Sequence, residues 1–118
     1  MPIIGGADGR LFTCAADLDK LWRRIFSNQI LSENMTLSFL KAQVKMGGEN
    51  EHNGSYGLGV YIAGNGDNTM YYAVGGDYGI DFFTAYFPGQ KIVASALGNT
   101  EINTYPILEA MLISPEFP

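Results

Sequence analysis

The chain has 118 residues, of which 47% are apolar and 16% are charged, and its formal net charge is −5. This composition predicts one globular domain over residues 1–118 and differs from that of a disordered chain. The acidic balance argues against a nucleic-acid partner, because phosphate binding needs clustered lysine and arginine. No apolar run reaches the roughly 18 residues of a membrane span, so none is expected. The single cysteine, Cys14, can form no internal disulfide and leaves the compartment unknown.

Two helices are expected in the first 50 residues. From Thr13, which can cap a helix, apolar residues recur at helical spacing and predict the first helix. Ser32 is a suitable N-cap for a second helix, which is expected to end at Gly47-Gly48. The apolar stripes are Leu18, Leu21, Trp22, Ile25 and Phe26 in the first helix, and Met35, Leu37, Leu40 and Val44 in the second.

The rest of the chain predicts mainly strands. Large and small side chains alternate over residues 56–63, and further strands are expected over residues 69–74, 80–87 and 91–97. Pro106 fits only the first turn of a helix, which predicts a last helix over residues 104–113. Its buried stripe would be Ile107, Leu108, Met111 and Leu112. This order predicts an α+β fold: a four-stranded antiparallel meander with two N-terminal helices and one C-terminal helix packed on it.

The connection over residues 74–79, VGGDYG, is unusual. It contains three glycines around Asp77 and Tyr78, whereas a simple hairpin needs a two-residue loop. One interpretation is a bulged hairpin whose glycines serve backbone geometry alone. The other is a turn whose backbone N–H groups stabilise a developing oxyanion. The residues alone leave both interpretations open.

Other motifs are few. No dinucleotide-binding or P-loop motif is present, and His52 and Cys14 lack companions at metal-ligand spacing, so we expect no cofactor and no metal site. Ser38 and Lys41 match the S-x-x-K pattern of a serine nucleophile and its lysine base. The alternative interpretation is that Ser38 occupies an ordinary position on the second helix.

Several segments, taken in order, resemble the C-terminal third of the serine β-lactamase-like hydrolases, which include class C β-lactamases, penicillin-binding proteins and esterases. The opening GGADGRLFTCAADLDKLWRRIFSNQILS resembles the family's G-G-L-x-S/T-T-A-x-D-L-x-x-F segment. YGLGVYI is similar to its Y-G-L-G-W/V strand. AVGGDYGIDFFTAYFPGQKIVASALGNTE is similar to its H-x-G-G-x-P-G-F strand and turn and to the strands that follow. The resemblance covers nearly the whole chain.

The resemblance implies the end of an α/β domain in which one strand forms a wall of the active site. The family's K-T-G or H-x-G motif falls on Ala73, Val74 and Gly75, and its oxyanion donor falls on Gly76. Ala73 stands where the family has lysine or histidine, and Tyr78 replaces the usual proline. The family's nucleophile and its Y-x-N motif lie upstream of the matched region. The resemblance therefore implies no catalytic residue in this chain and no activity of the chain alone.

Three functions follow from these observations. The first is a C-terminal fragment or truncated homologue of such a hydrolase, completed by a missing N-terminal segment. The second is a non-catalytic binding or assembly module. The third is a small hydrolase that uses Ser38 and Lys41. In the complete family fold, the strand over residues 91–97 pairs with N-terminal strands. Without them, its uncharged edge predicts self-association into a homo-oligomer.

Overall fold

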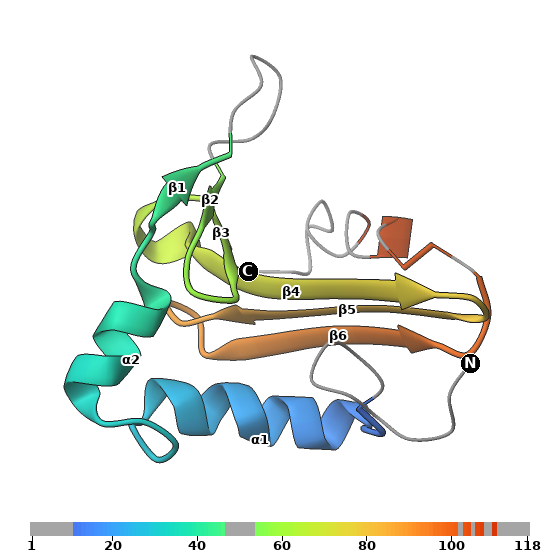
Figure 1. Cartoon of the computed structure of the whole chain (residues 1–118), viewed down its shortest axis with the longest axis horizontal. Coiled ribbons are helices and arrows are strands. Elements are labelled where there is room, and N and C mark those ends of the chain that lie inside the picture. The colour runs from blue at the N-terminus through green and yellow to red at the C-terminus, as the bar shows by residue number, and fades with distance from the viewer. Residues whose placement is uncertain (1–10, 47–53, 102, 105, 108–109, 111–118) are drawn as a thin grey trace.

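The computed structural model describes residues 11–46, 54–101, 103–104, 106–107 and 110. Two helices accompany one antiparallel sheet with the strand order β1-β2-β3-β4-β5-β6 (Figure 1). The elements are α1 (Ala15–Phe26), α2 (Glu33–Leu40), β1 (Val44–Lys45), β2 (Ser55–Tyr56), β3 (Tyr61–Ala63), β4 (Met70–Asp77), β5 (Ile80–Phe87) and β6 (Ile92–Gly98), with a short 3-10 helix, η1 (Gly66–Asn68), before β4. The predicted α+β class is confirmed. The predicted four strands are wrong, because the described part of the sheet has six.

The first predicted helix is present as α1. It begins after Cys14 rather than after Thr13, and the Cys14 side chain makes no capping hydrogen bond. Asp17 lies in the first turn, and Arg23 and Arg24 lie in the last turn, where each sign of charge interacts favourably with the helix dipole. The helix therefore forms from its own periodicity and end charges without a side-chain cap.

Trp22 anchors α1 to the sheet. Its side chain is 3% exposed, and its Nε1–H donates a hydrogen bond of 2.9 Å to Thr84 Oγ1 in β5. Thr84 Oγ1 lies 2.8 Å from Ser95 Oγ in β6, so one polar chain joins α1 to two strands. The Trp22 ring also stacks on Tyr86, with the ring centroids 6.4 Å apart. These contacts determine which face of β5 and β6 the helix covers.

The second helix begins as predicted but buries only part of its predicted apolar stripe. The Ser32 side chain accepts a hydrogen bond from the Met35 N–H, as an N-cap should. Met35 and Leu37, which belong to the predicted apolar stripe, are 57% and 64% exposed. Leu40, of the same stripe, does pack against the core cluster around Trp22, and Thr36, outside the stripe, is buried. The apolar content of this helix predicted its existence but not its orientation.

The same helix ends earlier than predicted. Its last residue is Leu40, and Val44, predicted to be helical, lies in β1. The Leu58 N–H donates a hydrogen bond of 3.3 Å to the Phe39 carbonyl. The Phe39 carbonyl therefore accepts its hydrogen bond from a neighbouring segment, and not from the N–H of a further helical turn.

The predicted strand over residues 56–63 is wrong, because this segment folds back on itself as β2 and β3. Gly59 has a φ of +110°, a conformation that glycine adopts readily and other residues rarely do. The Gly57 N–H donates to the Val60 carbonyl at 2.8 Å and closes the turn. A Cβ on Gly57 would lie 3.0 Å from the Phe39 carbonyl oxygen. The small residues of the alternating pattern are thus turn glycines, and not one face of a strand.

The three long strands β4, β5 and β6 correspond to three predicted strands, although β4 continues to Asp77, beyond the predicted end at residue 74. Side chains alternate between the two faces of this meander. On the α1 face, Trp22 packs with Tyr86, against which Tyr71 and Val93 also lie. The core of the opposite face consists of Met70, Phe83, Ala85, Phe87 and Ala94.

The connection between β4 and β5 is a two-residue loop, so the predicted irregular turn over residues 74–79 is wrong. Asp77 pairs with Ile80, and the register runs without a bulge through Gly76 and Gly75. Of the glycines in this connection, only Gly79 has a positive φ, at +76°. The other two are extended strand residues, and their role requires a different explanation.

The predicted C-terminal helix lies only partly in the described residues. Pro106, Ile107 and Ala110 are helical, which agrees with a proline in the first turn. Ile107 is 48% exposed, so its predicted burial is wrong. Leu108, Met111 and Leu112 lie outside the described residues.

We predict that Trp22→Phe lowers the free energy of unfolding by about 1 kcal/mol, because it keeps an aromatic ring but removes the N–H donor to Thr84. Urea unfolding followed by circular dichroism measures this. Trp22→Phe should cost less in a Thr84→Val background, since the acceptor is then absent. Equal costs in both backgrounds would show that the hydrogen bond contributes nothing.

Candidate functional site

The four residues predicted to form an active-site wall, Ala73, Val74, Gly75 and Gly76, are consecutive in β4. The pairing of β3 with β4 ends at Tyr72, whereas β5 pairs with β4 as far as Asp77. Beyond Tyr72, the other side of β4 has no strand partner within the described residues. We call residues 73–77 the open edge of β4.

The hairpin determines which backbone groups point out from this edge. Asp77 and Ile80 flank a two-residue loop and therefore form a hydrogen-bonded pair. Because such pairs alternate along an antiparallel ladder, Gly75 and Ala73 also bond to β5. The N–H and C=O groups of Val74 and Gly76 then point away from β5, toward the open edge. The residue predicted to supply an oxyanion donor thus has its N–H on the correct side of the strand.

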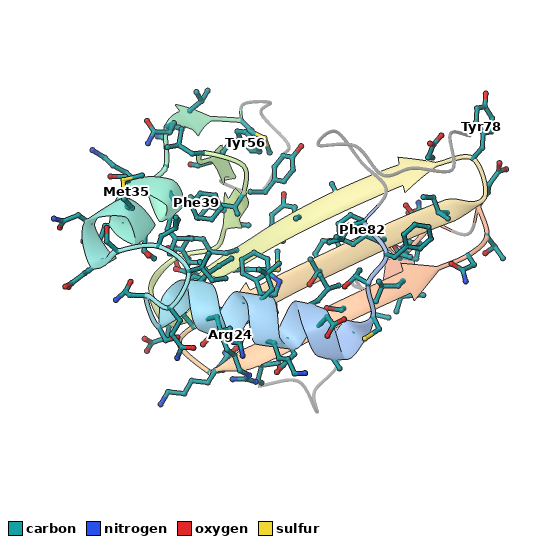
Figure 2. The ribbon with its side chains drawn as sticks, turned by 60° about the horizontal axis from the view of Figure 1, so that its bottom comes forward. Arg24, Met35, Phe39, Tyr56, Tyr78 and Phe82 are labelled. Atoms are coloured by element: carbon teal, nitrogen blue, oxygen red, sulfur yellow. The ribbon has the colours of Figure 1, made fainter. Side chains whose placement is uncertain are left out.

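The side chains of the open edge divide between the two faces. Ala73 pairs with Thr84, so it lies on the α1 face beside the hydrogen bond from Trp22. Gly75 pairs with Phe82, and a Cβ on Gly75 would lie 2.6 Å from a ring carbon of Phe82. In Figure 2, Phe82 points to the side of the sheet on which α1 lies. Gly75 is therefore a packing requirement of the aromatic ring.

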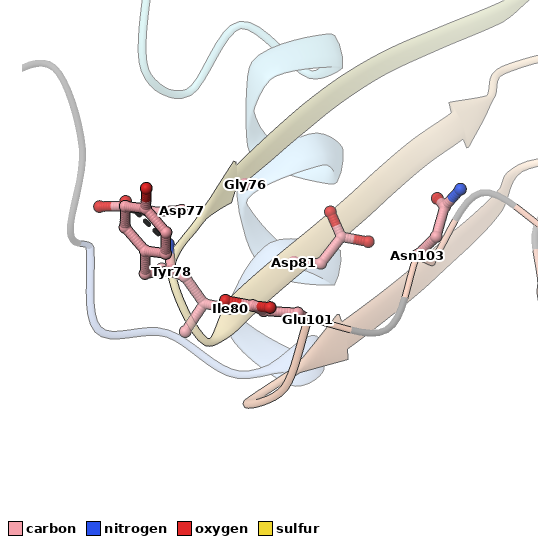
Figure 3. Close-up of a pocket in the computed structure, with 7 residues that line it drawn as sticks. All are labelled: Gly76, Asp77, Tyr78, Ile80, Asp81, Glu101 and Asn103. Carbon is pink, nitrogen blue, oxygen red and sulfur yellow. Dashed lines mark hydrogen bonds between the residues drawn. The ribbon is translucent and has the colours of Figure 1, made fainter.

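A cleft of about 520 Å³ lies at the β4–β5 hairpin on the face opposite α1 (Figure 3). Of the four candidate residues, only Gly76 lines it. The other lining residues are Asp77, Tyr78, Ile80, Asp81, Glu101 and Asn103. Tyr78 is 88% exposed, and its N–H donates to Asp77 Oδ1 at 2.8 Å. Three of these lining residues, Asp77, Asp81 and Glu101, are carboxylates and none is basic, so the cleft is acidic.

Asp81 ties the cleft to the segment after β6. The backbone N–H of Thr104 donates a hydrogen bond to Asp81 Oδ2, and Thr104 itself is buried. This backbone bond, followed by a side-chain hydrogen bond from Thr104 and a smaller contribution from the Phe82 N–H, lowers the pKa of Asp81. Asp81 therefore positions the segment after β6, which lines one side of the cleft, and it also adds negative charge to the cleft.

No protein-family model and no curated protein sequence matches the chain. Among solved structures, the crystal structure of penicillin binding protein from Bacillus halodurans is similar, with a TM-score of 0.84 and 28% sequence identity. The match covers 95% of this chain and 33% of that protein. The chain has the fold of part of a penicillin-binding protein. It spans about a third of the length of this relative.

This fold does not bring Ser38 to the open edge of β4. Ser38 is exposed on α2 and donates a hydrogen bond of 3.0 Å to the Asn34 carbonyl, while Lys41 follows the last residue of that helix. Figure 2 shows α2, marked by Met35, at the opposite end of the sheet from Tyr78 in the β4–β5 loop. The S-x-x-K match therefore lies apart from the open edge.

Within the described residues, no group of three or more histidine, cysteine or acidic side chains is arranged to hold a metal ion. In the same part of the chain, no helix has the length and apolar character needed to cross a bilayer.

Sequence reasoning missed Asp81 and Glu101 in the cleft. Asp81 is the one charged residue within the largely apolar run IDFFTAYF, and a charge in such a run indicates a specific partner. Its partner, Thr104, is 23 residues away, and no local pattern links the two.

We predict that Asp81 contributes to stability in a pH-dependent way. Its folded-state pKa is depressed, so its contribution is complete above the unfolded-state pKa, near 4, and is lost as the pH falls through the lower folded-state pKa. Asp81→Asn should lower stability at pH 7 and flatten the loss of stability in acid. Urea unfolding at a series of pH values between 7 and 2.5 measures both. An unchanged acid profile would contradict the prediction, and Asp67→Asn, at an exposed acidic residue outside this contact, is the matched control.

Proposed function

We propose that the chain is the C-terminal portion, or a truncated homologue, of a serine β-lactamase-like or penicillin-binding hydrolase. In this proposal, the open edge of β4 forms the wall of the active site that carries the oxyanion donor. The nucleophile and its base come from a separate or upstream segment, and the chain alone is inactive.

The observation that carries this proposal is the position of Gly76. Its N–H points out from a strand edge, in a fold shared with part of a penicillin-binding protein. A fixed backbone N–H at a strand edge can stabilise the negative charge that develops during acyl transfer. It cannot start the reaction, because acyl transfer also needs an activated nucleophile.

A chimeric protein tests the proposal. In it, this chain replaces the matched third of the Bacillus halodurans penicillin binding protein. We expect a fluorescent penicillin to label the chimera covalently but not the isolated chain, which should also leave nitrocefin and p-nitrophenyl esters intact. Labelling of the chain alone that disappears in Ser38→Ala would overturn the proposal in favour of the small-hydrolase function. If the folded chimera stays unlabelled, Ala73→Lys and Ala73→His test whether the missing cation is the cause, and failure of both also refutes the proposal.

A matched pair of variants in the chimera tests the role of Gly76. Gly76→Pro removes the outward N–H without removing a bond to β5, so labelling should be lost. Gly76→Ala keeps the N–H, and its Cβ would be in ordinary contact with Asp81 Oδ1 at 3.4 Å, so labelling should persist. Equal labelling of both variants would exclude Gly76 as a donor.

A second candidate function is a non-catalytic assembly module that self-associates through its sheet edge, and β6 supports it. This strand is the last in the sheet order of the described residues. Its sequence, IVASALG, has no charge and no proline to discourage pairing with another chain. Leu97 in this strand is 40% exposed.

We predict that the purified chain associates at micromolar concentration and that Leu97→Lys weakens this association, because a lysine on an edge strand opposes pairing. Sedimentation velocity measures the distribution of species. Leu37→Lys makes the same change at an exposed leucine of α2 and should leave association intact. A monodisperse monomer, or equal effects of the two variants, would contradict a role for the β6 edge.

A further inference from the structure

We infer that Asn65, in the connection between β3 and β4, is a site of spontaneous deamidation. This inference concerns a covalent modification of the chain and does not rest on the proposed function. It comes from the sequence Asn65-Gly66 together with the way the structure presents these two residues.

The reaction needs only the chain and water. The backbone nitrogen of Gly66 loses its proton to solvent base and attacks Cγ of Asn65. A C–N bond forms, the bond to the side-chain amide nitrogen breaks, and this nitrogen leaves as ammonia. Water then opens the resulting cyclic imide at either carbonyl to give aspartate or isoaspartate. No oxidant or reductant is involved, and glycine favours the attack because no side chain shields its nitrogen.

The structure leaves both reacting groups accessible. Asn65 and Gly66 are exposed, and although Asn65 is the N-cap of η1, its side chain makes no capping hydrogen bond. A Cβ built on Gly66 would meet no atom within 4 Å. The amide is therefore neither held nor covered.

Three other asparagines in the part of the chain that the structure describes lack this combination. The nitrogen that follows Asn34 donates to Ser32 Oγ, and the nitrogen that follows Asn68 donates to the Gly66 carbonyl. Asn99 precedes Thr100, a β-branched residue that crowds the attacking nitrogen. The other Asn-Gly pair, at residues 53–54, includes Asn53, which lies outside the described residues.

Deamidation at this position would disturb a contact between two turns. Gly89, in the β5–β6 turn, packs against the backbone of Asp67, such that a Cβ on Gly89 would lie 2.5 Å from the Asp67 carbonyl oxygen. Isoaspartate at position 65 inserts one methylene into the main chain two residues before this contact. It also changes the formal net charge from −5 to −6, because a neutral amide becomes a carboxylate. The modified chain should therefore be less stable as well as more acidic.

Incubation of the purified chain at pH 8.5 and 37 °C, followed by peptide mapping with mass spectrometry, tests the inference. We expect a gain of one mass unit at Asn65, with isoaspartate as the major product, well before any gain at Asn68 or Asn99. Asn65→Ser should abolish this gain and Asn68→Ser should not. Persistence of intact Asn65 while Asn68 or Asn99 reacts would overturn the inference.

A second measurement separates the methylene from the charge. The modified chain, purified by ion exchange, should melt at a lower temperature than Asn65→Asp, which adds the same charge with a normal backbone. Equal melting temperatures would refute the predicted disturbance of the contact with Gly89.

Discussion

The hydrogen bond from Trp22 to Thr84 is the interaction on which the rest of the structure depends. It joins α1 to β5, and Thr84 extends it to Ser95 in β6. Thr84 is also the register partner of Ala73, so the residue that holds the helix lies opposite the first residue of the open edge of β4. A shift of α1 would leave buried polar groups without partners, which is costly, and the helix position is therefore closely fixed. The position of the open edge of β4 relative to α1 therefore depends on this hydrogen bond.

Three glycines that looked like one flexible turn have separate physical roles. Gly75 accommodates the ring of Phe82, Gly76 directs an N–H from the strand edge, and Gly79 supplies the positive φ of a two-residue loop. The continuous register through all seven β4–β5 pairs makes this distinction possible, because it determines which backbone groups point outward. The sequence predicted all three glycines in one irregular turn, whereas two of them are paired strand residues.

Prediction from the sequence succeeded where structure follows from local pattern. The periodicity of α1, the Ser32 cap and the long strands β5 and β6 all belong to this class. Prediction failed where a contact with a segment elsewhere in the sequence determines the local structure. The end of α2 depends on a hydrogen bond from the Leu58 N–H. The turn between β2 and β3 contains glycines that, in the sequence, also fit the small-residue face of one continuous strand. In the candidate site, Gly76 was named from the resemblance, whereas the hydrogen bond between Asp81 and Thr104 joins residues 23 positions apart and follows from no local pattern.

The charge around Gly76 adds a constraint to the proposed function. An oxyanion at this N–H would develop at the end of the sheet where Asp77, Asp81 and Glu101 line a cleft, and negative charges in this region disfavour its formation. Ala73 provides no compensating cation where the resembling family has lysine or histidine. Asp81 cannot relieve the charge by protonation near neutral pH, because its hydrogen bonds with Thr104 lower its pKa. On the proposed function, the segment that brings the nucleophile must therefore also bring positive charge to this end of the sheet.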